Sequence, residues 1–133
     1  MVSCWRTTSG RLLQILGNDA DNVTSVVFSP DGKTLASGNY SSNTHLWDVE
    51  SGTLLQTLGG YTSVVSSVAF DSDGEMLASG SDDGTVWLRD VESGILLQTL
   101  GDHEGGVAGV AFRPDGAILA SGNWDGTIFL WGL

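Results

Sequence analysis

The segment VVSSVAFDSDGEMLASGSDDGTVWLRDVESGILLQTL, residues 64–100, decides the fold of this chain. Its apolar and β-branched runs are short, and turns rich in aspartate, serine and glycine separate them. This pattern predicts four short antiparallel strands, at residues 64–70, 76–80, 85–89 and 95–100. The segment lacks the apolar periodicity of a helix. Because one sheet of this size cannot bury both of its apolar faces, it needs neighbouring sheets.

The same pattern recurs along the chain at a constant distance of 42 residues. Leu-Ala-Ser-Gly begins at Leu35, Leu77 and Leu119, and Val-Glu-Ser-Gly begins at Val49 and Val91. A constant period without insertion or deletion indicates duplication of one structural unit. The period places one outermost strand at residues 10–17 and the repeats at about 18–59, 60–101 and 102–133, the last without its outermost strand.

The third repeat is similar to the WD-repeat β-propeller family. The similarity rests on Pro114-Asp115-Gly116, Leu119-Ala120-Ser121-Gly122, Trp124-Asp125-Gly126-Thr127 and Leu130-Trp131, and it extends over nearly the whole chain. It implies an all-β fold in which three four-stranded blades form a β-propeller arc.

The resemblance also implies a buried hydrogen-bonded tetrad in the third blade. Its members are His103, Ser121, Asp125 and Trp131. The matching residues are Asp19, Ser37, Ser41 and Trp47 in the first repeat, and Tyr61, Ser79, Asp83 and Arg89 in the second. Histidine, serine and aspartate are also the residue types of a hydrolase triad. No oxyanion-stabilising element lies beside them, so we interpret them as structural and expect no catalytic residue, cofactor or metal.

Three blades are fewer than the four to eight of typical closed propellers. An open arc would expose apolar faces and strand edges. We therefore expect homo-oligomerisation to close the ring, with Leu12–Leu16 of one copy completing the last blade of its neighbour. A homodimer with six blades is preferred, and a homotrimer with nine comes next. A piece of a larger WD-repeat regulatory protein and an engineered chain remain alternatives.

The charge balance argues against two classes of partner. Five lysines and arginines stand against sixteen aspartates and glutamates, for a net charge of −11. This balance disfavours nucleic acids and anionic membranes, which bind through basic residues.

Cys4 is the only cysteine, so an intrachain disulfide is excluded. Without a long apolar run that could be a signal peptide or membrane span, we expect a soluble, cytoplasmic protein.

These observations predict a non-catalytic scaffold that presents loops to an unknown protein partner. In the WD-repeat β-propeller family, which this chain resembles, partners usually bind one face of the ring. The corresponding candidates are Asn22, Thr24, Tyr40, Val64, Ser66, Asp82, Gly106, Ala108 and Trp124. Tyr40 and Trp124 are either exposed anchors or rings packed over a neighbouring blade. A multivalent propeller that binds a glycan or another small ligand is the alternative, although Tyr40, Asp82 and Trp124 differ where repeated sites would be alike.

Overall fold

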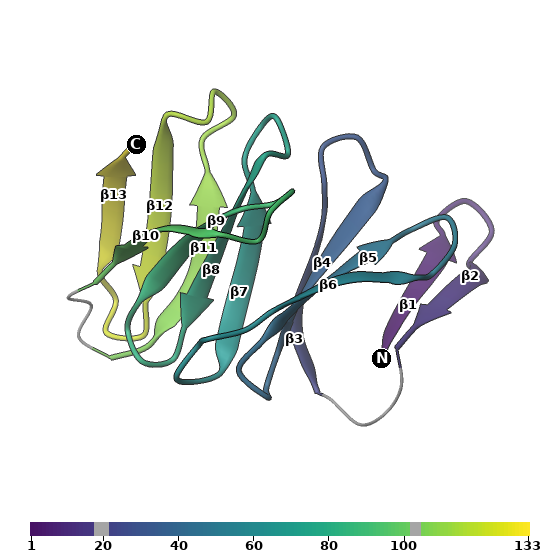
Figure 1. Cartoon of the computed structure of the whole chain (residues 1–133), viewed down its shortest axis with the longest axis horizontal. Coiled ribbons are helices and arrows are strands. Elements are labelled where there is room, and N and C mark those ends of the chain that lie inside the picture. Colours follow the sequence, from purple (N-terminus) through teal and green to yellow (C-terminus); the bar gives the residue numbers. More distant parts are fainter. Residues whose placement is uncertain (18–21, 102–104) are drawn as a thin grey trace.

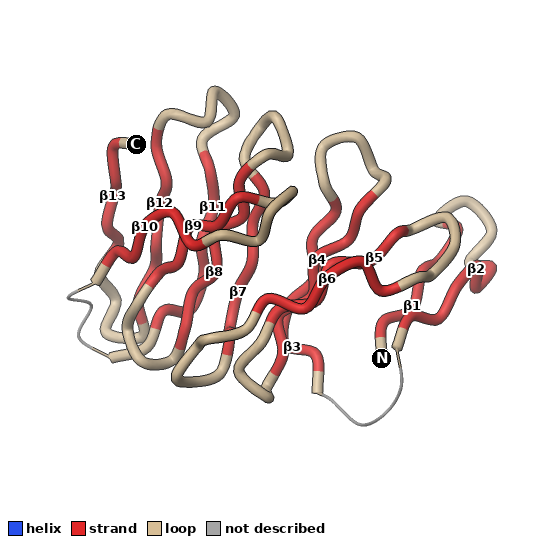
Figure 2. The backbone as a smooth tube through the Cα atoms, in the orientation of Figure 1, coloured by secondary structure: helices blue, strands red, loops and turns tan. Residues whose placement is uncertain are grey.

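The computed structural model describes residues 1–17, 22–101 and 105–133. These residues form thirteen short β-strands joined by turns and loops (Figure 2). The prediction of an all-β fold is therefore confirmed. Within the described ranges, no helix is long and apolar enough to cross a membrane.

The strands form four antiparallel sheets, each ordered as in the chain. The first sheet contains β1 (Val2–Arg6) and β2 (Arg11–Leu16). Blade 1 contains β3 (Val23–Phe28), β4 (Thr34–Asn39), β5 (Thr44–Asp48) and β6 (Leu54–Leu58). Blade 2 contains β7 (Val65–Phe70), β8 (Met76–Ser81), β9 (Val86–Asp90) and β10 (Leu96–Leu100). Blade 3 contains β11 (Val107–Phe112), β12 (Ile118–Asn123) and β13 (Ile128–Gly132).

The three blades repeat the same local geometry. In each, the pairing of the first two strands shifts register at the same repeat position, between Val65 and Ser67 in blade 2. The turns between these strands use a glycine with positive φ, such as Gly74 at 72°. Glycine adopts this conformation without the steric cost that a side chain would add. Equal sequence at equal spacing therefore produces equal turns.

The apolar core lies between blades rather than inside any one of them. The sheets stand side by side from β1–β2 to β11–β13 (Figure 1). Val68 and Phe70 of blade 2 pack in one buried cluster with Ala36, Leu46 and Leu58 of blade 1. An equivalent cluster joins blades 2 and 3, and a smaller one joins the β1–β2 hairpin to blade 1. Each blade is thus stabilised by burying its faces against its neighbours.

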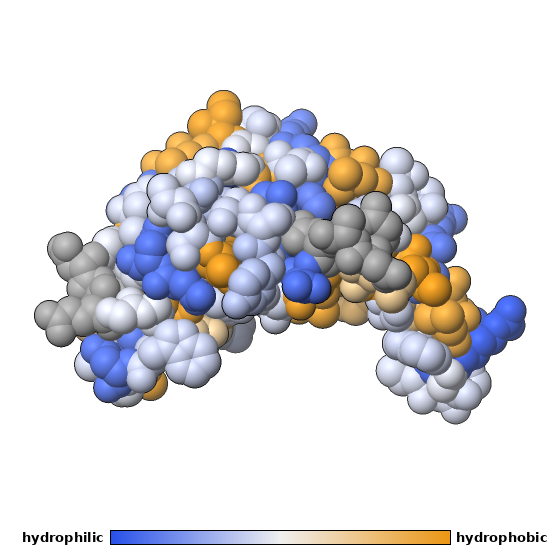
Figure 3. Space-filling model, turned by 90° about the horizontal axis from the view of Figure 1, so that it is seen from below, coloured by the Kyte–Doolittle hydropathy of each residue, from blue (hydrophilic) through white to orange (hydrophobic). Residues whose placement is uncertain are grey.

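The two ends of this series leave apolar faces open. Leu130 of β13 is 71% exposed, whereas its equivalents Leu46 and Leu88 are each 2% exposed. At the other end, Phe28 of β3 is 55% exposed, whereas its equivalent Phe70 is 9% exposed. Figure 3 shows the molecule as an arch with an empty concave side. We call Ile128 and Leu130 the trailing flank, and Val26 and Phe28 the leading flank.

Candidate functional site

The turns that precede the third strand of each blade all lie at one end of the blades, along the lower edge of Figure 1. In every blade, the first turn residue donates its backbone N–H to the loop before the first strand. These bonds are Tyr40 to Asn22 (2.8 Å), Asp82 to Val64 (3.0 Å) and Trp124 to Gly106 (3.1 Å). We call these six residues the loop face. The repeated bond fixes each turn against its own blade, which makes the face a rigid platform.

The largest side chains of the loop face are open to solvent. Tyr40 is 62% exposed and Trp124 is 72% exposed. Asp82 and Asn22 are also exposed, and Val64 is half-buried. In this chain neither ring is covered by a neighbouring blade. Exposed aromatic rings on a rigid surface are suited to anchoring a partner.

Thr24 and Ser66 have a structural position that sequence reasoning did not foresee. The Thr24 hydroxyl contacts the carbonyl of Gly38 at 3.0 Å and also that of Val65 in the next blade. Ser66 repeats this arrangement one blade further along. These hydroxyls therefore link β3 to β7 and β7 to β11. The third repeat has the exposed residue Ala108 at this position, where no such bond can form.

The structure brings together part of the predicted tetrad. The indole nitrogen of Trp131 donates a 3.0 Å hydrogen bond to the hydroxyl of Ser121. Asp125 accepts hydrogen bonds from the backbone N–H of Thr127 at 2.9 Å and from its hydroxyl at 2.6 Å. His103 lies outside the described residues, as does Asp19 of the first repeat.

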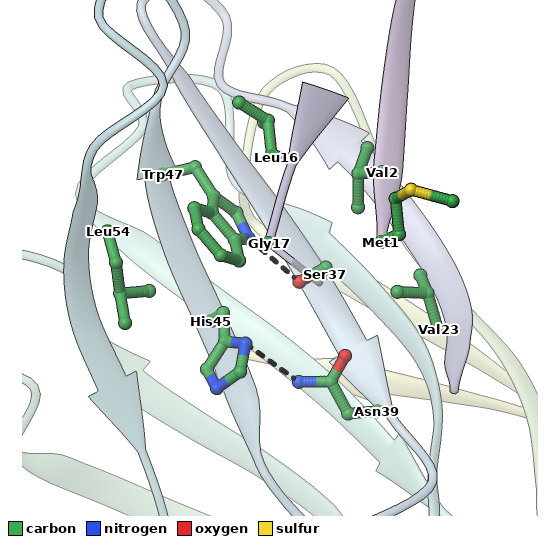
Figure 4. Close-up of a pocket in the computed structure, with 10 residues that line it drawn as sticks. All are labelled: Met1, Val2, Leu16, Gly17, Val23, Ser37, Asn39, His45, Trp47 and Leu54. Carbon is green, nitrogen blue, oxygen red and sulfur yellow. Dashed lines mark hydrogen bonds between the residues drawn. The ribbon is translucent and has the colours of Figure 1, made fainter. Parts of the chain in front are cut away.

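Blade 1 has the same indole-to-serine bond as blade 3. Trp47 donates to Ser37 over 3.0 Å, and both side chains are buried (Figure 4). On the same two strands, Nδ2 of Asn39 lies 3.2 Å from Nδ1 of His45. The bond between tryptophan and serine thus occurs in blades 1 and 3, and blade 2 has a different arrangement.

Blade 2 replaces this bond with an aromatic and cationic cluster. The hydroxyls of Tyr61 and Ser79 share a hydrogen bond of 2.5 Å, and the Tyr61 ring stacks on Trp87 with the centroids 4.5 Å apart. The guanidinium of Arg89 lies 5.0 Å from the centre of the Tyr61 ring. It also donates to the carbonyls of Gly94, at 3.1 Å, and Gly59. Exchanging tryptophan and arginine therefore keeps an indole at this interface, as the alternation of side chains predicts.

Asp83 adds a fixed negative charge beside the loop face. Burial raises the pKa of its carboxyl group, but hydrogen bonds from Thr62 and Thr85 outweigh this effect and lower the pKa below its usual value. The Thr85 hydroxyl donates to Oδ1 of Asp83 at 2.6 Å, and the Thr62 hydroxyl donates to Oδ2. Asp83 is therefore ionised at neutral pH.

A cavity of about 160 Å³ lies between the β1–β2 hairpin and blade 1 (Figure 4). It is lined by Met1, Val2, Leu16, Gly17, Val23, Ser37, Asn39, His45, Trp47 and Leu54. Most of these residues are apolar, and Trp47 and Leu16 belong to the core cluster at this junction. Among the described residues, no group of three histidine, cysteine, aspartate or glutamate side chains could hold a metal ion.

Comparison with known proteins identifies the repeat. The family described as "WD domain, G-beta repeat" matches residues 10–48, 52–90 and 94–132. A chain in "Structure of U3-55K" is 28% identical over 90% of this chain, with a TM-score of 0.86. A chain in "Crystal structure of RRP9 WD40 repeats" is 29% identical over 90% of this chain, also with a TM-score of 0.86. This chain spans 38% of the length of each.

A search of curated protein sequences finds no match. The three matches together cover most of the chain, and each begins on the last strand of one sheet and continues through the first three strands of the next blade, as residues 10–48 do from β2 to β5. The chain therefore belongs to the WD40 repeat family of β-propeller proteins.

Proposed function

We propose that this chain is a non-catalytic scaffold that closes into a β-propeller with a second copy and presents its loop face to a partner protein. The observation that carries this proposal is the match between its two open flanks. Each flank exposes residues whose equivalents are buried in the junctions within the chain. The internal junctions therefore supply a template for contact between copies.

The template specifies which residues would meet. In the junction of blades 1 and 2, Phe70 and Leu46 belong to one buried cluster. Phe28 is equivalent to Phe70, and Leu130 is equivalent to Leu46. A head-to-tail arrangement would place Phe28 of one copy against Leu130 of the other and remove both from water. Two copies would give six blades, within the usual range, and three copies would give nine.

Closure through β2 has one steric condition. Trp5 in β1 stands three repeat periods before Trp131 in β13, so both strands are third strands of a blade. If β2 of one copy completes blade 3 of the other, β1 and β13 compete for the position beside β12. Each junction can therefore hold only one of them. Deleting residues 1–6 removes this competition and is expected to strengthen self-association.

Sedimentation velocity on the full chain tests the closure. We expect a dimer for the natural sequence and a monomer for Leu130→Asp, because a carboxylate would be buried in the junction. Leu97→Asp is the matched control, since Leu97 is 56% exposed on the outermost strand β10, away from both flanks. A folded monomer of the natural sequence, unchanged by Leu130→Asp, would contradict closure by a second copy.

Further blades of a longer polypeptide are the second candidate for covering the flanks. The chain spans 38% of the matched WD40 chains, which supports this candidate. The same experiment separates the two, because a flank that belongs against other blades of its own polypeptide would not produce a discrete closed dimer.

The loop face favours a protein partner over a repeated small ligand. The equivalent turn positions hold Tyr40, Asp82 and Trp124, three side chains of different chemistry. Repeated binding of one glycan would need the same chemistry in each blade. A rigid, largely exposed surface with side chains of different chemistry suits a protein partner, whose surface also presents different side chains.

A further inference from the structure

The basic residues of the chain all lie away from the loop face. Arg6, Arg11, Lys33 and Arg113 belong to turns or strand ends at the opposite end of the blades, and Arg89 is buried. Asp82, Asp83 and Asp125 lie in the turns before the third strands, at the end of the loop face. This end of the molecule is therefore acidic, without a lysine or arginine of its own to neutralise it.

Trp124 and Asp82 meet at Gly106, although they come from neighbouring blades. A β-carbon placed on Gly106 would lie 3.0 Å from Cδ1 of Trp124 and 3.1 Å from both Cα and the carbonyl oxygen of Asp82. The missing side chain of Gly106 is what allows the indole and the Asp82 turn to approach this closely. Backbone hydrogen bonds to Gly106 and Val64 fix both turns. The exposed indole of Trp124 thus lies beside the fixed turn that carries the exposed residue Asp82.

We propose that Trp124 and Asp82 together bind a cationic side chain, an arginine or lysine in a basic segment of the partner protein. This inference rests on the proposed function of the loop face and specifies the chemistry of its partner. The indole face attracts a cation through its quadrupole, and tryptophan is the best of the aromatic residues for this contact. The carboxylate supplies the opposite charge, and Asp83 and Asp125 add to the negative potential.

The charges of the chain also decide against other partners. An acidic peptide or a nucleic acid would be repelled by the net charge of −11 and by the carboxylates at this end. A purely apolar segment would leave the Asp82 carboxylate without a partner. A basic segment satisfies the ring and the carboxylate at once, and the lysines and arginines of the chain lie elsewhere.

Fluorescence anisotropy of a labelled peptide tests this inference on the full chain. The probe is a short Gly-Arg peptide, and its matched neutral control has citrulline in place of arginine. We expect the arginine peptide to bind at least about tenfold more tightly, with an affinity that falls as salt rises. Trp124→Ala and Asp82→Asn should each weaken binding by about fivefold or more.

Two matched variants separate this site from the rest of the surface. Trp5→Ala removes an exposed ring from β1, outside the loop face, and Asp73→Asn removes an exposed carboxylate at the opposite end of the blades. Both should change the affinity by less than about twofold. Gly106→Ala should weaken binding, since the added methyl group separates Trp124 from the Asp82 turn.

The outcomes also distinguish this inference from the proposed function. Equal binding of the citrulline peptide, or an unchanged affinity in Trp124→Ala, would overturn the cation site but leave the loop face a binding surface. If neither peptide binds, the proposed cation site is overturned as well. Failure of ring closure would be seen separately, as a monomer in sedimentation.

Discussion

The hydroxyl groups of Tyr61 and Ser79 lie 2.5 Å apart in the junction between blades 1 and 2. Ser79 is fully buried, and the Tyr61 ring stacks on Trp87. Tyrosine at this position supplies both an apolar ring and a hydrogen-bonding group, so it satisfies a serine that would be costly to bury alone.

Tyr61→Phe tests the hydrogen bond while keeping the ring. The Ser79 hydroxyl would lose its partner, and we expect a loss of about 1–3 kcal/mol in the free energy of unfolding. Tyr40→Phe is the control, because Tyr40 is exposed and should change stability very little. Urea denaturation followed by circular dichroism measures both, and equal stability of Tyr61→Phe and the natural chain would contradict the assignment.

Arg89→Lys tests the buried guanidinium. Arg89 donates from two different nitrogens to the carbonyls of Gly94 and Gly59. A lysine ammonium is a point charge and cannot reproduce this planar fork. Losing one charged hydrogen bond should destabilise the chain by about 1.5–3 kcal/mol. Thermal unfolding measures the effect, with the surface substitution Lys33→Arg as a control that should be neutral.

Gly80→Ala tests how closely blades 2 and 3 approach. A β-carbon at Gly80 would lie 2.6 Å from Cγ1 of Val107, which is fully buried. The strands must separate to admit the methyl group, so we expect a loss of about 1–3 kcal/mol in the free energy of unfolding. An equal free energy of unfolding for Gly80→Ala and the natural chain in chemical denaturation would contradict this packing.

Gly122→Ala applies the same substitution at the open end of the arc. Gly122 is equivalent to Gly80, but a β-carbon placed on it would meet no atom within 4 Å in the single chain. In the closed ring, Val23 of a second copy would take the place that Val107 takes beside Gly80. We therefore expect Gly122→Ala to leave the fold intact but to weaken dimerisation, seen as concentration-dependent dissociation in sedimentation equilibrium. Unchanged association would argue against the proposed junction.

Acid should weaken the turns that follow β5 and β9, the third strands of blades 1 and 2. Asp48 accepts hydrogen bonds from the hydroxyl of Ser51 (2.6 Å) and its backbone N–H (2.9 Å), and Asp90 accepts the same bonds from Ser93. These bonds lower the pKa of both carboxyl groups below the ordinary value of 3.8. Their stabilisation is therefore present above 3.8 and is lost as the pH falls through the lowered pKa.

Denaturation in urea at several pH values tests this expectation. The natural chain should lose stability as the pH falls below about 4. The double variant Ser51→Ala and Ser93→Ala removes the hydroxyl donors, and its stability should depend less on pH in this range. An identical pH dependence in the two proteins would contradict a role for these turns.

Much of the fold could be predicted from the sequence because the repeat is local. The strands and turns of each blade depend on short patterns, such as the turn that needs Gly74, and these patterns recur every 42 residues. Strand ends were predicted to within about one residue. Val64 was predicted to begin a strand, but the described strand begins at Val65, while the Val64 carbonyl accepts a hydrogen bond from Asp82.

The candidate site was only partly predictable. Position in the repeat located Tyr40, Asp82 and Trp124, because the family resemblance assigns those turns to one end of the blades. It also proposed Thr24 and Ser66, whose hydroxyls contact backbone carbonyls of the next blade. No local pattern reports contacts between residues that lie about one repeat apart in sequence.

The sequence by itself determined the number of blades, the strands within them and the sign of the charge, since these follow from periodicity and composition. Only the tertiary structure decided which apolar residues are covered. Leu46 and Leu130 occupy the same repeat position, yet one is buried and the other is open to solvent. The physical reason is that burial depends on a neighbouring sheet, which Leu46 has and Leu130 in this chain does not.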